Sequence, residues 1–297
     1  NYFGSVAYNY GGKYLIDFTI RRDGSFNFPK NNRFGTFTGV SLGWTISKEP
    51  FMSGTNSWLD NLKLRGSWGK MGNDDVPDFQ YLLKYQFQDW YIFGEPSSPN
   101  HVTSLVNVNT PNPDISWEVS RTRNIGFDAS LWNNSFSMSF DYFYEKRRKI
   151  LITRNEAVPT YTSLELPDEN LGKVDNQGVD LTLGYSNKIG DISYNVGGNL
   201  SYHRNEIVFM DEPKDVPEWR KKEGHPMHSW VVYETDGIFN TQEELDNTKV
   251  TLPGTKPGDI KYVDVNGDEK ITGDDKVRKY TSPIPRYQFG FKAGIRY

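Results

Sequence analysis

The hydrophobic residues of this chain recur at every second position over long stretches. In the segment 135–144, Phe136, Met138, Phe140, Tyr142 and Tyr144 alternate with serines and an aspartate. A period of two is the period of a β-strand, whose successive side chains point to opposite faces. The same alternation recurs in 14–21, 38–46, 179–186, 192–202 and 287–297. The sequence therefore predicts an all-β protein.

The lengths of these segments and of their connections narrow the fold class. Soluble sheets commonly use about five or six residues per strand, whereas a tilted strand needs about 9–11 residues to cross a membrane. Several segments reach the longer value. Short links at 11–13, 133–134 and 188–191 are followed by long polar excursions at 23–36, 71–116, 153–172 and 205–285. Short periplasmic turns and long extracellular loops are typical of outer-membrane barrels. We expect a partial antiparallel up-and-down transmembrane β-barrel of about nine long strands with long extracellular loops.

The composition fits a wall between lipid and water. Aromatic residues make up 15% of the chain, although hydrophobic residues as a whole reach only 36%. The polar positions of the strands hold mostly Ser, Thr, Asn, Gly and Asp, which suits a hydrated lumen. Tyr and Trp near the strand ends suit the two headgroup levels of a membrane. No run of about 18 apolar residues occurs, so a transmembrane helix is excluded. The link at 47–61 is longer than its side of the barrel predicts.

A secreted soluble β-sandwich module that binds glycans is the alternative, in which a second sheet covers each apolar stripe. Other classes of protein are disfavoured. The net charge of -4 offers no electrostatic footprint for nucleic acid. The absence of cysteine excludes disulfide scaffolds, zinc ribbons and thiol nucleophiles. The sequence contains no nucleophile elbow, phosphate-binding glycine loop or HExxH motif, so we expect no enzyme.

Several spaced motifs carry a family resemblance. In chain order they are YLIDFTIRRDGS at 14–25, NNRFGTF at 31–37, WTISKEPFM at 44–52, LKLRGSWG at 62–69, NPDISWE at 112–118, DGIF at 236–239 and GDIKYVDVNGD at 258–268. Together they resemble the second half of a SusC/RagA-type TonB-dependent outer-membrane transporter. The resemblance covers essentially the whole chain.

The resemblance implies a barrel of about 22 strands, plugged by an N-terminal domain, in the outer membrane of Bacteroidetes-type bacteria. It implies TonB-dependent import of oligosaccharides or peptides, a SusD-like surface lipoprotein over the mouth, and a TonB complex that pulls on the plug. Outer-membrane lipid would surround the wall. We expect residues 1–297 to be part of the barrel domain, with the plug, the N-terminal strands and the final strands outside this chain. Glycan and peptide importers share these motifs, so the substrate stays open.

One loop carries the spacing of a calcium site. Asp264, Asn266, Asp268 and Asp275 occupy positions one, three, five and twelve of a Ca²⁺-binding loop. Glu269 stands where a glycine normally makes the sharp turn, and the twelfth position is Asp rather than a bidentate Glu. The residues predict either Ca²⁺ in an extracellular loop or a polar Asx-turn without metal.

Two further groups of residues are candidates for contacts outside the wall. Trp90, Tyr91, Trp219 and Trp230 lie in the long excursions, where aromatic rings stack on carbohydrate or peptide substrates, or pack loops together. The basic run KRRK at 146–149 ends a strand that rises toward the outside. It could pair with phosphates of a lipopolysaccharide-bearing leaflet or form a solvated loop base.

Overall fold

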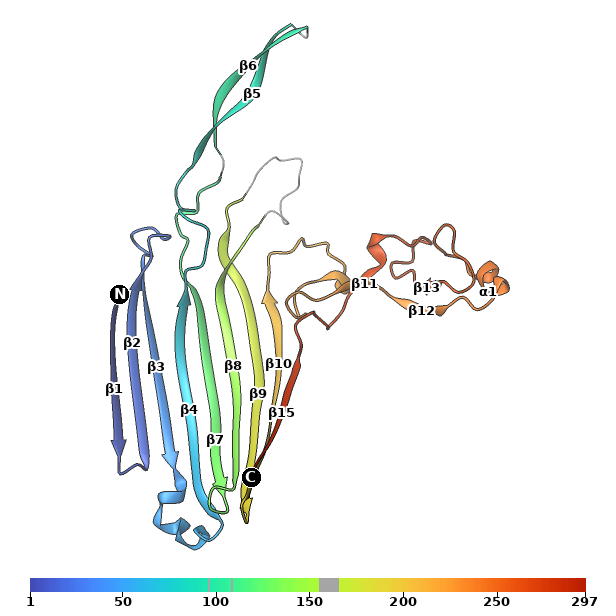
Figure 1. Ribbon diagram of the computed structural model, residues 1–297. Helices are drawn as coiled ribbons and strands as arrows, with labels where there is room; N and C mark the ends of the chain where they lie inside the picture. Colours follow the sequence, from blue (N-terminus) through green and yellow to red (C-terminus); the bar gives the residue numbers. More distant parts are fainter. Residues whose placement is uncertain (96, 108, 155–165) are drawn as a thin grey trace. The chain divides into compact units, whose positions relative to one another are not determined.

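Nine long strands form one antiparallel sheet. The computed structural model describes the whole chain except residues 96, 108 and 155–165 (Figure 1). The strands follow one another in the order β1-β2-β3-β4-β7-β8-β9-β10-β15. Their bounds are β1 (Tyr2–Tyr10), β2 (Tyr14–Gly24), β3 (Phe34–Thr45), β4 (Leu59–Asn73), β7 (Glu118–Leu131), β8 (Phe136–Ile152), β9 (Glu169–Ile189), β10 (Ile192–Phe209) and β15 (Tyr287–Arg296). This confirms the predicted all-β antiparallel architecture and its number of long strands.

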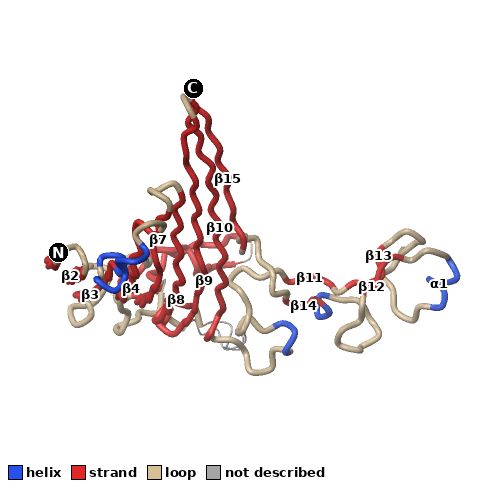
Figure 2. The backbone as a smooth tube through the Cα atoms, turned by 90° about the horizontal axis from the view of Figure 1, so that it is seen from below, coloured by secondary structure: helices blue, strands red, loops and turns tan. Residues whose placement is uncertain are grey.

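The long excursions hold small elements of their own. Two-stranded sheets pair β5 (Tyr85–Glu95) with β6 (Ser98–Asn107), β11 (Val231–Tyr233) with β14 (Lys276–Arg278), and β12 (Thr235–Ile238) with β13 (Ile260–Tyr262). In the described residues, helical backbone occurs in short segments, of which α1 (Gln242–Asn247) is one (Figure 2). Among the described residues, no helix is both long and apolar enough to cross a membrane.

The chain divides into two compact units. The sheet unit comprises 1–204, 208–211 and 286–297, and the loop unit comprises 205–207 and 212–285. The loop unit is inserted in the chain between β10 and β15. The long strands and the β5–β6 hairpin belong to the sheet unit, whereas β11 to β14 and α1 belong to the loop unit.

Tight turns join the strands at one end of the sheet, which we call the turn end. Gly11 and Gly12 link β1 to β2 with φ angles of 60° and 64°. Two consecutive residues with positive φ make a type I′ turn, whose twist matches that of the flanking strands. The opposite end, which carries the long excursions, is called the loop end.

The link between β3 and β4 also lies at the turn end and folds into short 3-10 turns at Ile46–Lys48 and Pro50–Thr55. The carboxylate of Glu49 ties it to the sheet, because it accepts hydrogen bonds from the Tyr14 hydroxyl at 2.6 Å and from the Trp44 indole N–H at 3.2 Å. Lys13 lies 3.3 Å from the same carboxylate. The Tyr14 hydrogen bond is the main reason that the pKa of Glu49 lies below its ordinary value.

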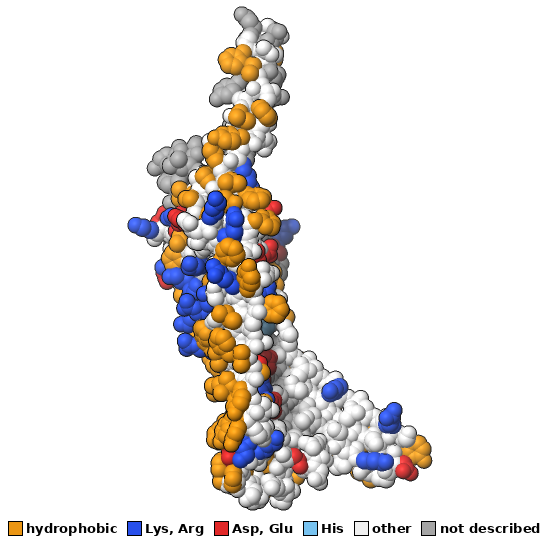
Figure 3. All heavy atoms as spheres, turned by 90° about the vertical axis from the view of Figure 1, so that its left-hand side faces the viewer, with side chains coloured by type: hydrophobic (Ala, Val, Ile, Leu, Met, Phe, Trp, Pro, Cys, Tyr) orange, Lys and Arg blue, Asp and Glu red, His pale blue; other side chains and the backbone are white. Residues whose placement is uncertain are grey.

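The register places the apolar residues of successive strands on one face, which we call the outer face. Leu64, Phe127, Phe140 and Leu181 form one such row across β4, β7, β8 and β9. Hydrophobic side chains follow the sheet in Figure 3. In the described part of the chain no second sheet stacks on this face, and Phe136, Phe140 and Tyr194 stay partly exposed. The β-sandwich alternative is therefore wrong, because the apolar stripes have no protein layer over them.

Aromatic residues mark both ends of the outer apolar band. Trp44 and Trp132 are exposed at the turn end, and Trp68 and Tyr142 are exposed toward the loop end. On β8, Tyr144 follows Phe136 by eight residues, which is roughly 26 Å along a strand. A strand tilt of about 40° brings this to roughly 20 Å across the membrane, near the height of about 25 Å of outer-membrane apolar bands.

A small buried cluster lies where the loops leave the sheet. Trp117 packs against Phe28 and Phe37 with ring centroids 5.2 Å apart in each pair, and Ile115 completes the cluster. The indole N–H of Trp117 donates to the Arg33 carbonyl oxygen at 3.3 Å. The cluster joins the loop after β2 to the segment before β7, so the long loops start from a fixed base.

Candidate functional site: the inner wall and the loops

The face opposite the apolar band, here the inner face, carries the polar half of each strand. Because the side-chain period is two, every residue between two outer-face residues points inward. Inward positions on eight strands include Asp17, Ser41, Lys63, Arg65, Asn124, Asp128, Ser139, Asp141, Asp180, Asn195 and Lys292. This surface has the chemistry of a wall around a hydrated lumen.

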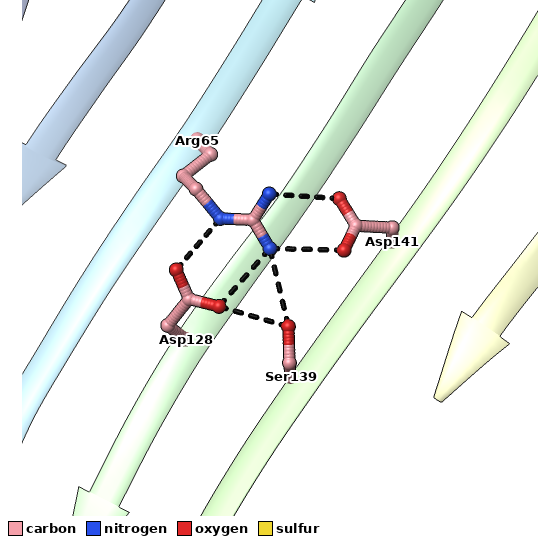
Figure 4. A network of polar contacts seen from close by, with 4 residues as sticks. All are labelled: Arg65, Asp128, Ser139 and Asp141. Atoms are coloured by element: carbon pink, nitrogen blue, oxygen red, sulfur yellow. Dashed lines mark hydrogen bonds and ion pairs between the residues drawn. The ribbon is translucent and has the colours of Figure 1, made fainter. Parts of the chain in front are cut away.

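A network of charged groups lies at the centre of the inner face (Figure 4). The guanidinium of Arg65 on β4 lies between the carboxylates of Asp128 on β7 and Asp141 on β8. Its nitrogens are 2.7 Å from Asp128 Oδ2 and 2.9 Å and 3.0 Å from the two oxygens of Asp141. The Ser139 hydroxyl donates to Asp128 Oδ1 at 2.8 Å. The planar fork of arginine suits this bidentate contact, which a lysine cannot reproduce.

Gly126 makes this network possible. It is the register partner of both Arg65 on β4 and Asp141 on β8, so the arginine side chain must pass over it. A Cβ atom at Gly126 would lie 2.5 Å from Asp141 Oδ1 and 2.5 Å from the Phe140 carbonyl oxygen. The position therefore requires a residue without a side chain. The need arises from close approach rather than from a special backbone angle.

Other inward groups extend the polar surface around the network. Asp180 lies opposite Asp141 in the register of β8 and β9, and its carboxylate accepts a hydrogen bond from the Ser201 hydroxyl. Lys63 lies opposite Asp128. A shallow depression of about 380 Å³ adjoins Arg65 and is lined by inward residues that include Asp17, Ser41 and Asn124. The wall thus offers both hydrogen-bond donors and acceptors to whatever fills the lumen.

In the loop unit the four predicted calcium ligands lie in one loop, 264–275, with Asp264, Asn266 and Asp268 in its first turn and Asp275 in the 3-10 turn that ends it. Both carboxylate oxygens of Asp264 accept backbone N–H groups, from Gly267 and Glu269, at 2.8 Å. Asn266 and Asp268 each accept the amide two residues further on at 2.9 Å. Glu269 has a φ of 61°, which is the left-handed conformation that favours glycine at this position of a calcium loop.

Asp275 is fully buried within this loop. Its carboxylate accepts the amides of Thr272 at 2.7 Å, Val265 at 3.0 Å and Asn266 at 3.4 Å. Burial alone would raise the pKa of Asp275, but these hydrogen bonds together hold it below its ordinary value. In the described residues no group of three or more His, Cys, Asp and Glu side chains is arranged to hold a metal ion. The acidic side chains here stabilise the backbone of the turn, and calcium binding stays a prediction.

The four predicted substrate-binding aromatics lie in different settings. The Trp219 indole N–H donates to the Asp274 carbonyl oxygen at 3.2 Å, so this ring is tied to the loop unit. Trp230 is 53% exposed, and its backbone is held by hydrogen bonds with Thr281 and Lys279. Trp90 and Tyr91 lie on β5, and their side chains are outside the described residues.

The basic run at 146–149 separates into three environments. Lys146 and Arg148 occupy outer-face positions, whereas Arg147 faces inward and forms an ion pair with Glu118 at 2.6 Å. Lys149 has a φ of 60° at a register shift between β8 and β9. On β7, Arg121 is the register partner of Lys146 and Arg123 that of Tyr144, and both arginines were missed by sequence reasoning. The signal was present, since both arginines share the parity of Ile125 and Phe127 on the outer face.

Comparison with known proteins settles the family. A family model described as "TonB dependent receptor-like, beta-barrel" matches residues 1–297. The chain belongs to this TonB-dependent receptor family. TonB-dependent receptor P3 of Formosa agariphila is 28% identical over 99% of this chain and 30% of its own length. TonB-dependent receptor SusC of Bacteroides thetaiotaomicron is 27% identical over 100% of this chain and 30% of its own length.

Solved structures support the same fold. The RagAB peptide transporter superposes with a TM-score of 0.76 at 24% identity, over 99% of this chain and 31% of the solved chain. The TonB-dependent receptor family, its location in the outer membrane and the likeness to Bacteroidetes proteins are thereby confirmed. The chain spans about a third of the length of the relatives that it matches, and its sheet is a partial barrel that is not closed.

Proposed function

We propose that residues 1–297 form part of the barrel wall and of the extracellular loops in a TonB-dependent importer of oligosaccharides or peptides. The two-sided sheet is the observation that carries the proposal. Its outer face is apolar and carries no second sheet in the part of the chain that the structure describes, while its inner face holds a network of hydrogen-bonded charges around Arg65. A sheet with these two faces separates hydrocarbon from water, as the wall of a transport barrel does.

The remaining parts of the importer lie outside this chain. In the proposal, further strands close the barrel, a plug domain fills it, and a TonB complex acts on the plug. A SusD-like lipoprotein closes over the extracellular mouth. Membership of a receptor family and the likeness to SusC and to the RagAB peptide transporter support this arrangement. The family is one of receptors and transporters rather than of enzymes, so the chain contributes wall and loops rather than a reaction centre.

The importer hypothesis is tested in the bacterium that encodes the full-length protein. Deletion of the gene should abolish uptake of one class of fluorescent oligosaccharide or peptide, and complementation should restore it. A deletion of the TonB gene should have the same effect, because passive diffusion through a porin would not need energy. Uptake that persists in both deletion strains would contradict the proposal.

The partner and the substrate class need separate measurements. Affinity purification of the full-length protein should recover a lipoprotein in about equal amount. Substrate class is decided by measuring binding of defined oligosaccharides and defined peptides to the purified complex. Binding of neither class, with an intact barrel, would exclude both substrate assignments while leaving the wall assignment untouched.

A further inference from the structure

Basic side chains gather on the outer face of the sheet unit near the loop end. Figure 3 shows Lys and Arg side chains grouped part-way up the sheet, with hydrophobic side chains both below and above them. The outer-face register positions at and beyond the aromatic rim include six basic residues, which we call the basic belt: Lys70, Arg121, Arg123, Lys146, Arg148 and Lys173. They come from four adjacent strands, β4, β7, β8 and β9.

The belt begins where the apolar band ends. On β7, Ile125 on the outer face is preceded by Arg123, two residues earlier, and by Arg121, four residues earlier. On β8, Tyr142 and Tyr144 are followed by Lys146 and Arg148 in the same alternation. Arg121, Arg123 and Lys146 are exposed. The belt therefore lies at the headgroup level of the leaflet toward which the long loops point.

Like charges face each other directly within the belt. Arg121 is the register partner of Lys70 on one side and of Lys146 on the other. Such directly opposed side chains lie about 5 Å apart at Cβ, and like charges in this position destabilise a sheet. The arrangement is expected where an anion from outside the protein lies between the cations.

One carboxylate, that of Asp175, lies among the basic residues of the belt, and it already has partners within the protein. Asp175, opposite Lys146, forms an ion pair with Arg148 at 2.5 Å and accepts the Tyr144 hydroxyl at 2.5 Å. In the part of the chain that the structure describes, Arg121, Arg123 and Lys146 have no ion pair. The belt as a whole keeps a large positive charge next to the membrane.

A groove in the apolar band reaches the lower margin of the belt at Ile125 and extends to Trp44 at the turn end. It has a volume of about 470 Å³ and lies over Gly43 and Gly66, with walls that include Leu42, Trp44, Leu64 and Ile125. Ile125 is also the residue directly below Arg123 on the outer face. A free phosphate ion would use the belt alone, whereas a lipid would use the belt for its headgroup and the groove for an acyl chain.

We propose that the basic belt binds the phosphate groups of a phosphorylated lipid, lipopolysaccharide, in the outer leaflet. Arg121 and Lys146 clamp one phosphate between β7 and β8, and Arg123 approaches it from the row below. Arg148 is held in place by Asp175. The site depends on the outer-membrane location of the chain and not on the identity of the imported substrate.

The test uses the full-length protein in detergent micelles that contain lipid A, with bound lipid counted by native mass spectrometry. Phosphorylated lipid A should bind, and the same lipid A after removal of its phosphates should bind at least about tenfold more weakly. The triple variant Arg121→Gln, Arg123→Gln and Lys146→Gln should lose affinity for phosphorylated lipid A by a similar factor. Inorganic phosphate should not compete at millimolar concentration.

Arg147→Gln is the matched control, because Arg147 lies between Lys146 and Arg148 in the chain but faces inward. It should leave lipid A binding unchanged. Heat-dependent gel migration reports whether each variant forms a barrel. If the triple variant does not fold, the comparison of the two lipids on the unaltered protein still decides. Equal binding of both lipids, or full binding by a folded triple variant, would overturn the proposal.

Discussion

Arg65 and Asp141 meet across Gly126: the Arg65 Nη1 atom lies 3.0 Å from Asp141 Oδ1, although their strands, β4 and β8, do not pair with each other. The contact spans three strands of the wall. It can form only when β7 lies between β4 and β8, so it depends on the order of the strands in the sheet.

Replacement of Arg65 by Met should destabilise the barrel by about 1–2 kcal/mol. The substitution leaves Asp128 and Asp141 facing each other without a cation, and the partial exposure of the network limits the cost. Urea unfolding of the full-length protein measures the effect. Lys63→Met, on the same strand and face, should have less effect. Adding Asp128→Asn and Asp141→Asn to Arg65→Met should recover most of the loss, and a failure to recover would contradict the charge explanation.

Gly126→Ala should cost about 1–3 kcal/mol, because the new methyl group would overlap Asp141 and the Phe140 carbonyl oxygen. Gly69→Ala on β4 is the control, since nothing lies within 4 Å of a Cβ atom there. The same unfolding measurement applies to both variants. Equal stabilities would show that the space above Gly126 is not needed.

The turn-end link should loosen in acid. The pKa of Glu49 is lowered chiefly by the Tyr14 hydrogen bond, so its stabilising effect is present above the ordinary value of about 4.3 and is lost as the pH falls through the lower folded value. Hydrogen exchange in 46–55, corrected for the intrinsic pH dependence, should show reduced protection at pH 3 relative to pH 6. In Glu49→Gln the protection should be weak at both pH values, and a pH response that persists there would assign the effect to another group.

The loop at 264–275 should depend on Asp275 with or without metal. Asp275→Ala removes the acceptor of three backbone amides and should increase proteolysis of the loop unit in the full-length protein. The control Asp274→Ala alters an exposed neighbour that pairs with Arg220 at 2.8 Å. Equal cleavage of the two variants would argue against a structural part for Asp275.

The calcium prediction is tested on the same loop. Calcium should raise the unfolding temperature relative to EDTA if Asp264, Asn266, Asp268 and Asp275 bind it. Asp268→Ala should abolish the difference. Identical unfolding temperatures in calcium and in EDTA would show that these side chains only accept hydrogen bonds from backbone amides.

Strand positions could be predicted from the sequence because burial on one side enforces a strict period of two. The nine strands and their short turns follow from that rule. The alternation of apolar and polar residues ends at Tyr142, Phe143 and Tyr144, however, and only charged residues follow in 145–149. The letters alone therefore do not reveal that Arg147 pairs with Glu118 while Lys146 lies on the outer face. Only the register of β7 against β8 shows this.

The site was less predictable than the wall. In the Arg65 network, Asp128 lies 63 positions and Asp141 lies 76 positions after Arg65 in the chain. No local sequence motif predicts contacts over such separations. In the sequence, nothing distinguishes Gly126 from the other small residues at the polar positions of the strands. The small sheets within the long loops were not predicted, since three-residue strands such as β11 and β14 are too short to show a period.

The two aromatic rims and the charges above them have a mechanical consequence. Moving the sheet along the membrane normal would draw indole and phenol rings into hydrocarbon at one rim and cationic groups away from headgroups at the other. Both displacements cost free energy, so the wall keeps a constant depth. A force applied to a group held inside the barrel would then move that group, while the barrel itself stays at its depth in the membrane.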